Sequence, residues 1–388
     1  MTSLATSRAM RWEERVMRSA HPIAYPALRM ARGPVLRVPG LGILVRDAAL
    51  LRSVLLNTAS FTKTGPGSPS DLWTGVLGPS VLLNMEGADH QALRRRLAPI
   101  FAPSSVEPLV AESLGEPLAR LARRLSEGEP VDLVEEVRRY SSIAIGRLVG
   151  LDSAELTAEL FHKVSSITSM VRLTRSTLTP TEVAKARVVM AELGLHAQRA
   201  YHSGDEQTVP GRMRALGLTE AEALGAVGAF VLTGTETLVS YIPRLVCLLV
   251  DTSWLPLVAA DRSLVEPAIA EGLRVTTPSP VMLRSVVAAD SIGPVAVRPG
   301  DRVILATFAA NRALGPFDPA ANTAATLRQL WFGAGSHFCL GAPLALAQIR
   351  SVVDSLLDAV PDGSLRVLSR RPARGVLIPG YAKVVIGR

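Results

Sequence analysis

The stretch Phe332-Gly-Ala-Gly-Ser-His-Phe-Cys-Leu-Gly341 places a cysteine, Cys339, in a glycine-rich loop. Glycines allow such a loop to turn sharply and to bring backbone N–H groups near the sulfur. A helix predicted to begin just after the loop adds the positive potential of its N-terminus. Both effects favour the thiolate, which serves as a nucleophile or as a metal ligand. The alternative for a lone cysteine is a structural thiol buried in a turn.

On either side of the loop the pattern changes from strands to a helix. Apolar residues at helical spacing predict a helix over about 342–360, and Pro361-Asp-Gly363 ends it. Before the loop, Val281–Val287, Val295–Val297 and Val303–Leu305 predict strands joined by turns.

Further upstream, residues 88–275 have a mostly helical pattern. Thr219-x-x-Glu222 is a capping box, and we predict that the helix it opens runs to about Val250, about 46 Å, with a kink at Pro243. Near the N-terminus, residues 35–45 predict a hairpin and Asp47 predicts the cap of a helix over 48–56. The expected fold is mainly α with a minor β part, in one unit over 1–388. Its helix-rich parts are about 88–275 and 342–360, and its β-rich parts lie near 34–46 and 281–305.

Composition narrows the class of protein. With 388 residues, 48% apolar, the chain can bury a large core, which excludes a disordered chain or a disulfide scaffold. The two cysteines, Cys247 and Cys339, favour a reducing cytoplasm. The net charge of +8 comes from scattered arginines with few aromatic residues, so we expect no nucleic-acid partner. Charged residues within the most apolar window, 221–250, argue against a membrane span.

The pattern Phe-Gly-x-Gly-x-His-x-Cys-x-Gly resembles the haem-ligand loop of the cytochrome P450 monooxygenases. The resemblance implies the P450 fold, with a long central helix over the haem. It also implies that Cys339 is the axial ligand of iron in haem b and that Phe332, Gly333 and Gly341 belong to the cofactor-binding loop. Ala342–Ala345 continues the resemblance, whereas Gln348 stands where many members carry an acidic residue.

Two upstream motifs extend this resemblance. Glu271-Gly-Leu-Arg274 matches the family's Glu-x-x-Arg pair, whose i, i+3 spacing places both side chains on one helix face. Thr233-Gly-Thr-Glu-Thr237 resembles the central-helix signature. It implies that Gly234 leaves room above the iron, that Thr237 hydrogen-bonds dioxygen or a water, and that Glu236 relays protons. The alternative is a solvated acid beside a threonine that bonds back to its own helix.

The family also binds the two haem propionates with basic side chains. His90-x-x-x-Arg94 resembles the propionate-binding helix, and its i, i+4 spacing presents two donors on one face. Arg284 and His337 are the other contacts that the resemblance implies. Arg95 and Arg96 add charge to the same helix, either as an electron-donor docking surface or as a solvated face.

The function implied is a cytoplasmic haem-thiolate monooxygenase that activates dioxygen to hydroxylate a hydrophobic small molecule in natural-product metabolism. A ferredoxin with its reductase would supply the electrons. Alternatives are oxidative coupling or desaturation, a thiolate-haem protein that only binds a ligand, and a cysteine hydrolase without haem. The expected substrate wall comprises residues 64–83, 158–202, 230–234, 281–283 and 377–378.

Overall fold

The computed structural model describes residues 2–151, 158–171, 177–321 and 323–388. The described helices are α1 (Thr2–Ala20), α2 (Ala24–Met30), α3 (Ala48–Leu56), α4 (Pro69–Leu77), α5 (Gly87–Leu97), α6 (Pro103–Ser126), α7 (Leu133–Val149), α8 (Ala158–Met170), α9 (Pro180–Ser203), α10 (Val209–Ala215), α11 (Glu220–Gly234), α12 (Glu236–Asp251), α13 (Leu255–Ala260), α14 (Val265–Thr276), α15 (Thr307–Arg312) and α16 (Ala342–Ala359). The described strands are β1 (Val35–Val38), β2 (Gly42–Val45), β3 (Phe61–Thr62), β4 (Val131–Asp132), β5 (Met282–Val286), β6 (Asp290–Ile292), β7 (Val295–Val297), β8 (Arg302–Leu305), β9 (Arg366–Pro372) and β10 (Tyr381–Gly387).

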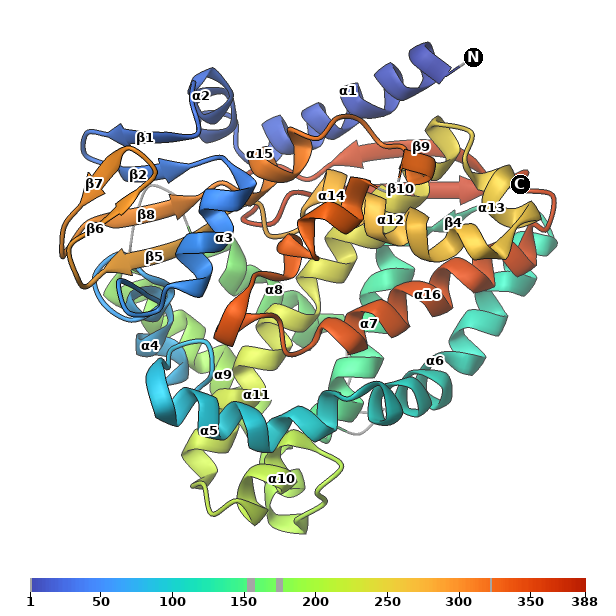
Figure 1. The fold of residues 1–388 in the computed structure, drawn as a ribbon. Helices are drawn as coiled ribbons and strands as arrows, with labels where there is room; N and C mark the ends of the chain where they lie inside the picture. Colours follow the sequence, from blue (N-terminus) through green and yellow to red (C-terminus); the bar gives the residue numbers. More distant parts are fainter. Residues whose placement is uncertain (1, 152–157, 172–176, 322) are drawn as a thin grey trace.

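The strands form small sheets beside a larger helical part (Figure 1). The largest sheet has the order β1-β2-β8-β5-β3, and only its β2–β8 pair is parallel. The second has the order β4-β10-β9, and β6 and β7 form a two-stranded ribbon. Strands from residues 35–62 and from residues 282–305 therefore share one sheet, which ties the N-terminal hairpin to the strands before the cysteine loop.

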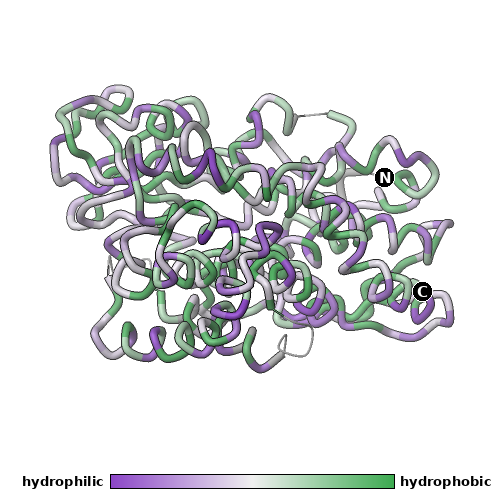
Figure 2. The backbone as a smooth tube through the Cα atoms, turned by 90° about the horizontal axis from the view of Figure 1, so that it is seen from below, coloured by the Kyte–Doolittle hydropathy of each residue, from purple (hydrophilic) through white to green (hydrophobic). Residues whose placement is uncertain are grey.

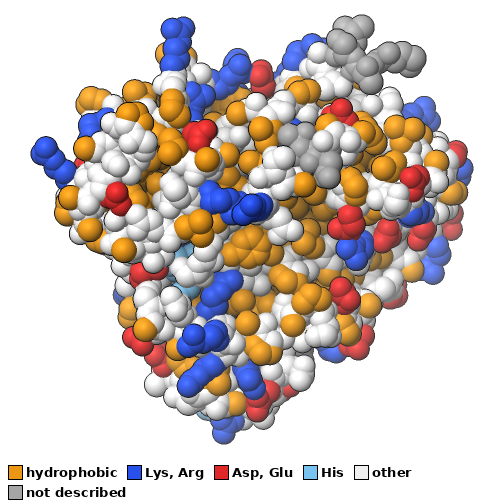
Figure 3. Space-filling model, viewed as in Figure 1, with side chains coloured by type: hydrophobic (Ala, Val, Ile, Leu, Met, Phe, Trp, Pro, Cys, Tyr) orange, Lys and Arg blue, Asp and Glu red, His pale blue; other side chains and the backbone are white. Residues whose placement is uncertain are grey.

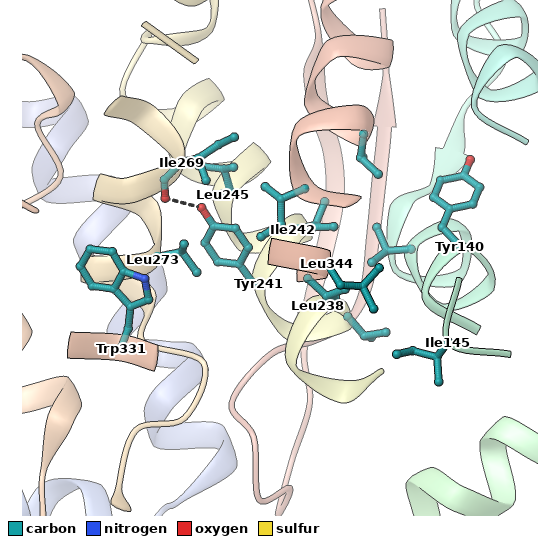
Figure 4. Packing of buried hydrophobic residues seen from close by; sticks show 14 of the residues in the cluster. Tyr140, Ile145, Leu238, Tyr241, Ile242, Leu245, Ile269, Leu273, Trp331 and Leu344 are labelled. Atoms are coloured by element: carbon teal, nitrogen blue, oxygen red, sulfur yellow. Dashed lines mark hydrogen bonds between the residues drawn. The ribbon is translucent and has the colours of Figure 1, made fainter. Parts of the chain in front are cut away.

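The hydrophobic core surrounds α12. Leu238, Tyr241 and Ile242 project from this helix toward side chains of α7, α14 and α16 (Figure 4). The buried Tyr241 hydroxyl donates a hydrogen bond to the Ile269 carbonyl of α14 at 2.7 Å, which satisfies its polar atom. Hydrophobic and hydrophilic residues alternate along the chain (Figure 2), as expected where helices bury one face.

Several local predictions are confirmed. β1 and β2 form the expected antiparallel hairpin, and Asp47 caps α3 by accepting a hydrogen bond from the Leu50 N–H at 2.9 Å. Thr219 and Glu222 form the capping box of α11. The mainly α fold with a minor β part is also confirmed.

The long central helix differs from the prediction. It is interrupted at Thr235, between α11 and α12, whereas Pro243 lies inside α12. Thr233, Thr235 and Thr237 each donate a side-chain hydrogen bond to the carbonyl four residues earlier, at 2.8, 3.0 and 3.1 Å. Such bonds compete with the backbone ladder and bend helices. Three of them at alternate positions account for a break here rather than at the proline.

One described stretch, Glu220–Asp251, is long and apolar enough to cross a membrane. However, 56% of its apolar window is buried inside the fold, as in the core helix of a soluble protein.

Candidate active site

The cysteine loop is held by its own backbone. The Cys339 N–H donates to the Phe332 carbonyl at 2.8 Å, so the two ends of the predicted motif meet. Gly333 and Gly335 have φ angles of +85° and +67°, which side chains rarely adopt. Gly341 is the N-cap residue of α16, and the backbone N–H groups of Gly341 and Ala342 reach the Cys339 sulfur.

Cys339 faces an internal cavity of about 510 Å³. Phe332, Gly333 and Gly341 line the same cavity, and Gly234 and Thr237 line it from α11 and α12. All five predicted segments contribute residues to the cavity wall. Four of them do so within 69–83, 230–234, 281–283 and at 377, and the fifth contributes Val171. Residues 172–176 of that fifth segment lie outside the described chain.

Burial raises the pKa of the Cys339 thiol above its usual value. The Gly341 and Ala342 N–H groups and the cations of Arg94 and Lys63 act in the opposite direction. The loop N–H groups therefore favour the thiolate as expected, but burial outweighs them, so the pKa of the free thiol is raised. A metal cation bound to the sulfur is the partner that reverses this direction.

The residues at the helix break contact their own helix and α7. The Thr237 hydroxyl donates to the Thr233 carbonyl, which is the alternative considered for this residue. Glu236 lies 3.9 Å from the Arg138 guanidinium of α7. A Cβ atom at Gly234 would come within 2.5 Å of the Ile145 Cδ1 methyl, so any larger residue there would force the Ile145 side chain of α7 to shift.

The predicted basic side chains converge on one end of the cavity. His90 and Arg94 reach it from α5, Arg284 from β5, and His337 from the cysteine loop. The rings of His90 and His337 lie 4.1 Å apart, and His90 Nδ1 is buried without a partner. Arg94 donates to the Phe338 carbonyl at 2.5 Å, and Arg284 donates to the Leu283 carbonyl at 2.8 Å.

Burial and neighbouring charge destabilise the cationic forms of these groups. The pKa of His90 falls to about 4 because burial and nearby His337 oppose its protonation. Burial also lowers the pKa of Arg284 to about 10. Among the described residues, no Asp or Glu lines the cavity. The site is therefore electropositive and suited to an anionic ligand.

Two members of this cluster, Lys63 and Glu86, were missed by the sequence analysis. Lys63 lines the cavity, and burial and the nearby Arg284 lower its pKa to about 7. Glu86 Oε1 lies 2.6 Å from His337 Nε2, and Glu86 Oε2 accepts from the Lys63 backbone N–H at 2.8 Å. Burial alone would raise the pKa of Glu86, but the His337 and Lys63 hydrogen bonds hold it at about 2.

The Glu271–Arg274 pair braces the segment that leads to the cysteine loop. Both side chains are buried, and Arg274 Nη2 lies 2.5 Å from Glu271 Oε1. Arg274 also donates to the carbonyls of Asn311, Gly315 and Pro316. Since the pair anchors residues 311–316, it positions the chain before the loop.

These contacts fit a haem. A thiol opens into a large cavity, and basic groups gather at one end of it, where His90 Nδ1 is buried without a partner. Among the described residues, no group of three or more His, Cys, Asp or Glu side chains is arranged to hold a metal ion by itself.

Several named proteins resemble this chain in sequence. The chain is 28% identical to cytochrome P450 107B1 of Saccharopolyspora erythraea over 336 residues, which is 82% of this chain and 78% of that protein. It is 28% identical to the mycinamicin IV hydroxylase/epoxidase of Micromonospora griseorubida over 316 residues, 77% of each chain. The chain is a cytochrome P450. No model of a known protein family matches it.

Structural comparison supports the P450 fold. The crystal structure of P450BioI in complex with an acyl carrier protein ligated to hexadec-9Z-enoic acid superposes with a TM-score of 0.80. The two chains are 19% identical, and the match covers 96% of this P450 and 99% of that chain. This P450 is accordingly a monooxygenase of the oxidoreductase class. Membership implies a haem, dioxygen, a small-molecule substrate and redox partners.

Proposed function

We propose that this P450 binds haem b through Cys339 and hydroxylates a hydrophobic small molecule, in the cytoplasm and within natural-product metabolism. We also propose that residues 1–388 form one catalytic unit. The observation that supports the proposal is the Cys339 sulfur at the wall of a cavity that also contains Thr237 and the basic cluster. In this proposal His90, Arg94 and Arg284 hold the haem propionates, together with the second ring nitrogen of His337.

The haem, when bound, supplies the oxidative chemistry, and electron donation from a thiolate favours O–O cleavage. The protein supplies the pocket and the protons. Glu236 is 19% exposed and lies beside Arg138, where it can take a proton from solvent. Thr237 is the next residue and lines the cavity, so its Oγ1 can hold that proton at the reacting end.

The substrate wall supports an apolar substrate. Leu82, Leu83, Phe230, Val281 and Leu377 line the cavity together with other aliphatic residues. Among the relatives, one is named for hydroxylation and epoxidation of mycinamicin IV, and the structural neighbour contains a hexadecenoic acid carried by its partner. Long apolar molecules are thus the first compounds to test, by titrating them into the ferric protein and following the spin state of the iron. Spin-state shifts with apolar compounds support the assignment, and a panel in which only small polar compounds bind would contradict it.

Replacing Thr237 by alanine should leave haem bound but uncouple electron use from product formation. Loss of a positioned proton donor costs roughly a hundredfold in a proton-transfer step, so more of the reductant should be consumed without product. The measurement is hydrogen peroxide released per electron consumed in the presence of a substrate found by the titration. Thr235→Ala is the matched control, because Thr235 is buried, makes the same kind of back-bond and does not line the cavity. Unchanged coupling in Thr237→Ala would show that this hydroxyl is dispensable.

We further propose that the electron donor is an acidic ferredoxin that docks on the basic residues of α5. Arg95 and Arg96 are exposed, and Lys and Arg side chains gather in the region of α5 in Figure 3. Replacing both arginines by glutamate should slow reduction by a ferredoxin at least about tenfold at low salt, and the difference from wild type should shrink as salt is added. Equal reduction rates at low salt would exclude this surface.

A further inference from the structure

We propose that Lys63 is a further contact for the carboxylates of the bound cofactor, beside Arg94 and Arg284. The inference rests on the proposed haem site and deepens it. It assigns a role to a residue that belongs to none of the motifs by which the site is recognised in the sequence.

The backbone fixes Lys63 next to the basic cluster. Lys63 directly follows β3, and its N–H donates to Glu86 at 2.8 Å. Glu86 is the N-cap residue of α5, the helix that carries His90 and Arg94. One carboxylate therefore ties the Lys63 backbone to the start of the helix that supplies the predicted propionate contacts.

The Lys63 side chain faces the cavity and lies within electrostatic range of Arg284, Glu86 and Arg94. Among the described residues, no hydrogen-bond acceptor or ion-pair partner of its Nζ atom is found. An ammonium group held inside a protein without an acceptor is costly, and such a group is retained where a ligand supplies the acceptor.

The charges of the cluster favour a ligand with two negative charges. With Lys63 protonated, Lys63, Arg94 and Arg284 carry three positive charges, and Glu86 carries one negative charge. The Glu86 carboxylate is already engaged by His337 and by the Lys63 backbone. The cations therefore exceed the carboxylate by two before any histidine is counted, and the two propionates of a haem supply that number of negative charges.

The experiment compares haem loss from wild type and Lys63→Met when the propionates are free and when they are esterified. Each protein is loaded with haem or with haem dimethyl ester, and release is followed by transfer to excess apomyoglobin. Loss of one charge-assisted contact should make Lys63→Met release haem roughly ten to a hundred times faster than wild type. Lys63→Arg should stay within about threefold, because it retains the positive charge. Lys185→Met, an exposed lysine on α9, is the matched control and should not differ from wild type.

Release of haem dimethyl ester shows whether Lys63 contacts the propionates. Because the ester carries no negative charge at these positions, wild type and Lys63→Met should release it at rates that agree within about twofold. Equal release of ordinary haem by the two proteins would overturn the inference, as would a difference that persists with the ester. If Lys63→Met releases haem like wild type but binds an acidic substrate more weakly, Lys63 contacts the substrate. That result also contradicts the inference.

Two further measurements distinguish a cofactor contact from a role of Lys63 in folding. The cofactor-free Lys63→Met protein should melt no lower than cofactor-free wild type, because it has lost only an unpaired, partly buried cation. A lower melting temperature would mean that Lys63 acts on the fold. Failure of wild type to take up haem would remove the proposed function itself. Uptake with the thiolate spectrum but no effect of Lys63 would remove only this inference.

Discussion

Arg274→Ala is expected to lower the free energy of unfolding by about 3–5 kcal/mol, since it leaves the Glu271 carboxylate buried without its partner. Arg274 is fully buried, and its guanidinium also holds three carbonyls of the segment 311–316. The variant should therefore also retain haem poorly, because the chain leading to Cys339 loses its anchor. Urea unfolding of the haem-free proteins measures the first effect separately from the second.

A matched control exists in the exposed pair Arg350–Glu266. These two side chains form an arginine–glutamate ion pair at 2.6 Å, but each is about half exposed. Arg350→Ala should cost no more than about 1 kcal/mol, as surface ion pairs do. If Arg274→Ala were as mild as Arg350→Ala, the buried pair would not be the brace that we describe.

The second large effect concerns the sulfur. Cys339→Ser should abolish the absorbance band that is typical of thiolate-ligated haem in the reduced, carbon monoxide-treated protein, because a serine hydroxyl does not replace a thiolate as an iron ligand. Cys247→Ser is the matched control. Cys247 is buried on α12, burial raises the pKa of its thiol to about 12, and it does not line the cavity. That variant should keep the band, and a band retained by Cys339→Ser would mean that the ligand is misassigned.

Local patterns predicted much of the fold and of the site. The hairpin, the caps at Asp47 and Thr219 and the Glu271–Arg274 pair all depend on residues close together in the chain. Their spacing is sufficient to predict them. The cysteine loop is recognisable for the same reason, since its glycines and Cys339 lie within ten residues.

Features that depend on distant residues could not be predicted in this way. The Glu86–His337 contact joins positions 251 residues apart. Lys63 faces the cavity from the end of β3, with its backbone N–H bonded to Glu86, and no pattern around Lys63 indicates this. The break at Thr235 results from three threonine back-bonds, whereas Pro243 gave the more obvious signal. β9 was missed because most of its residues are polar or exposed and it pairs only with β10.

The proposed function requires a bond between Cys339 and haem iron. The most direct test is the absorbance spectrum of the purified wild-type protein, expressed with ample haem, reduced and exposed to carbon monoxide. We predict a Soret band at the position typical of thiolate ligation, present at close to one haem per chain. Colourless protein, or a band at the position typical of histidine ligation, would contradict the account.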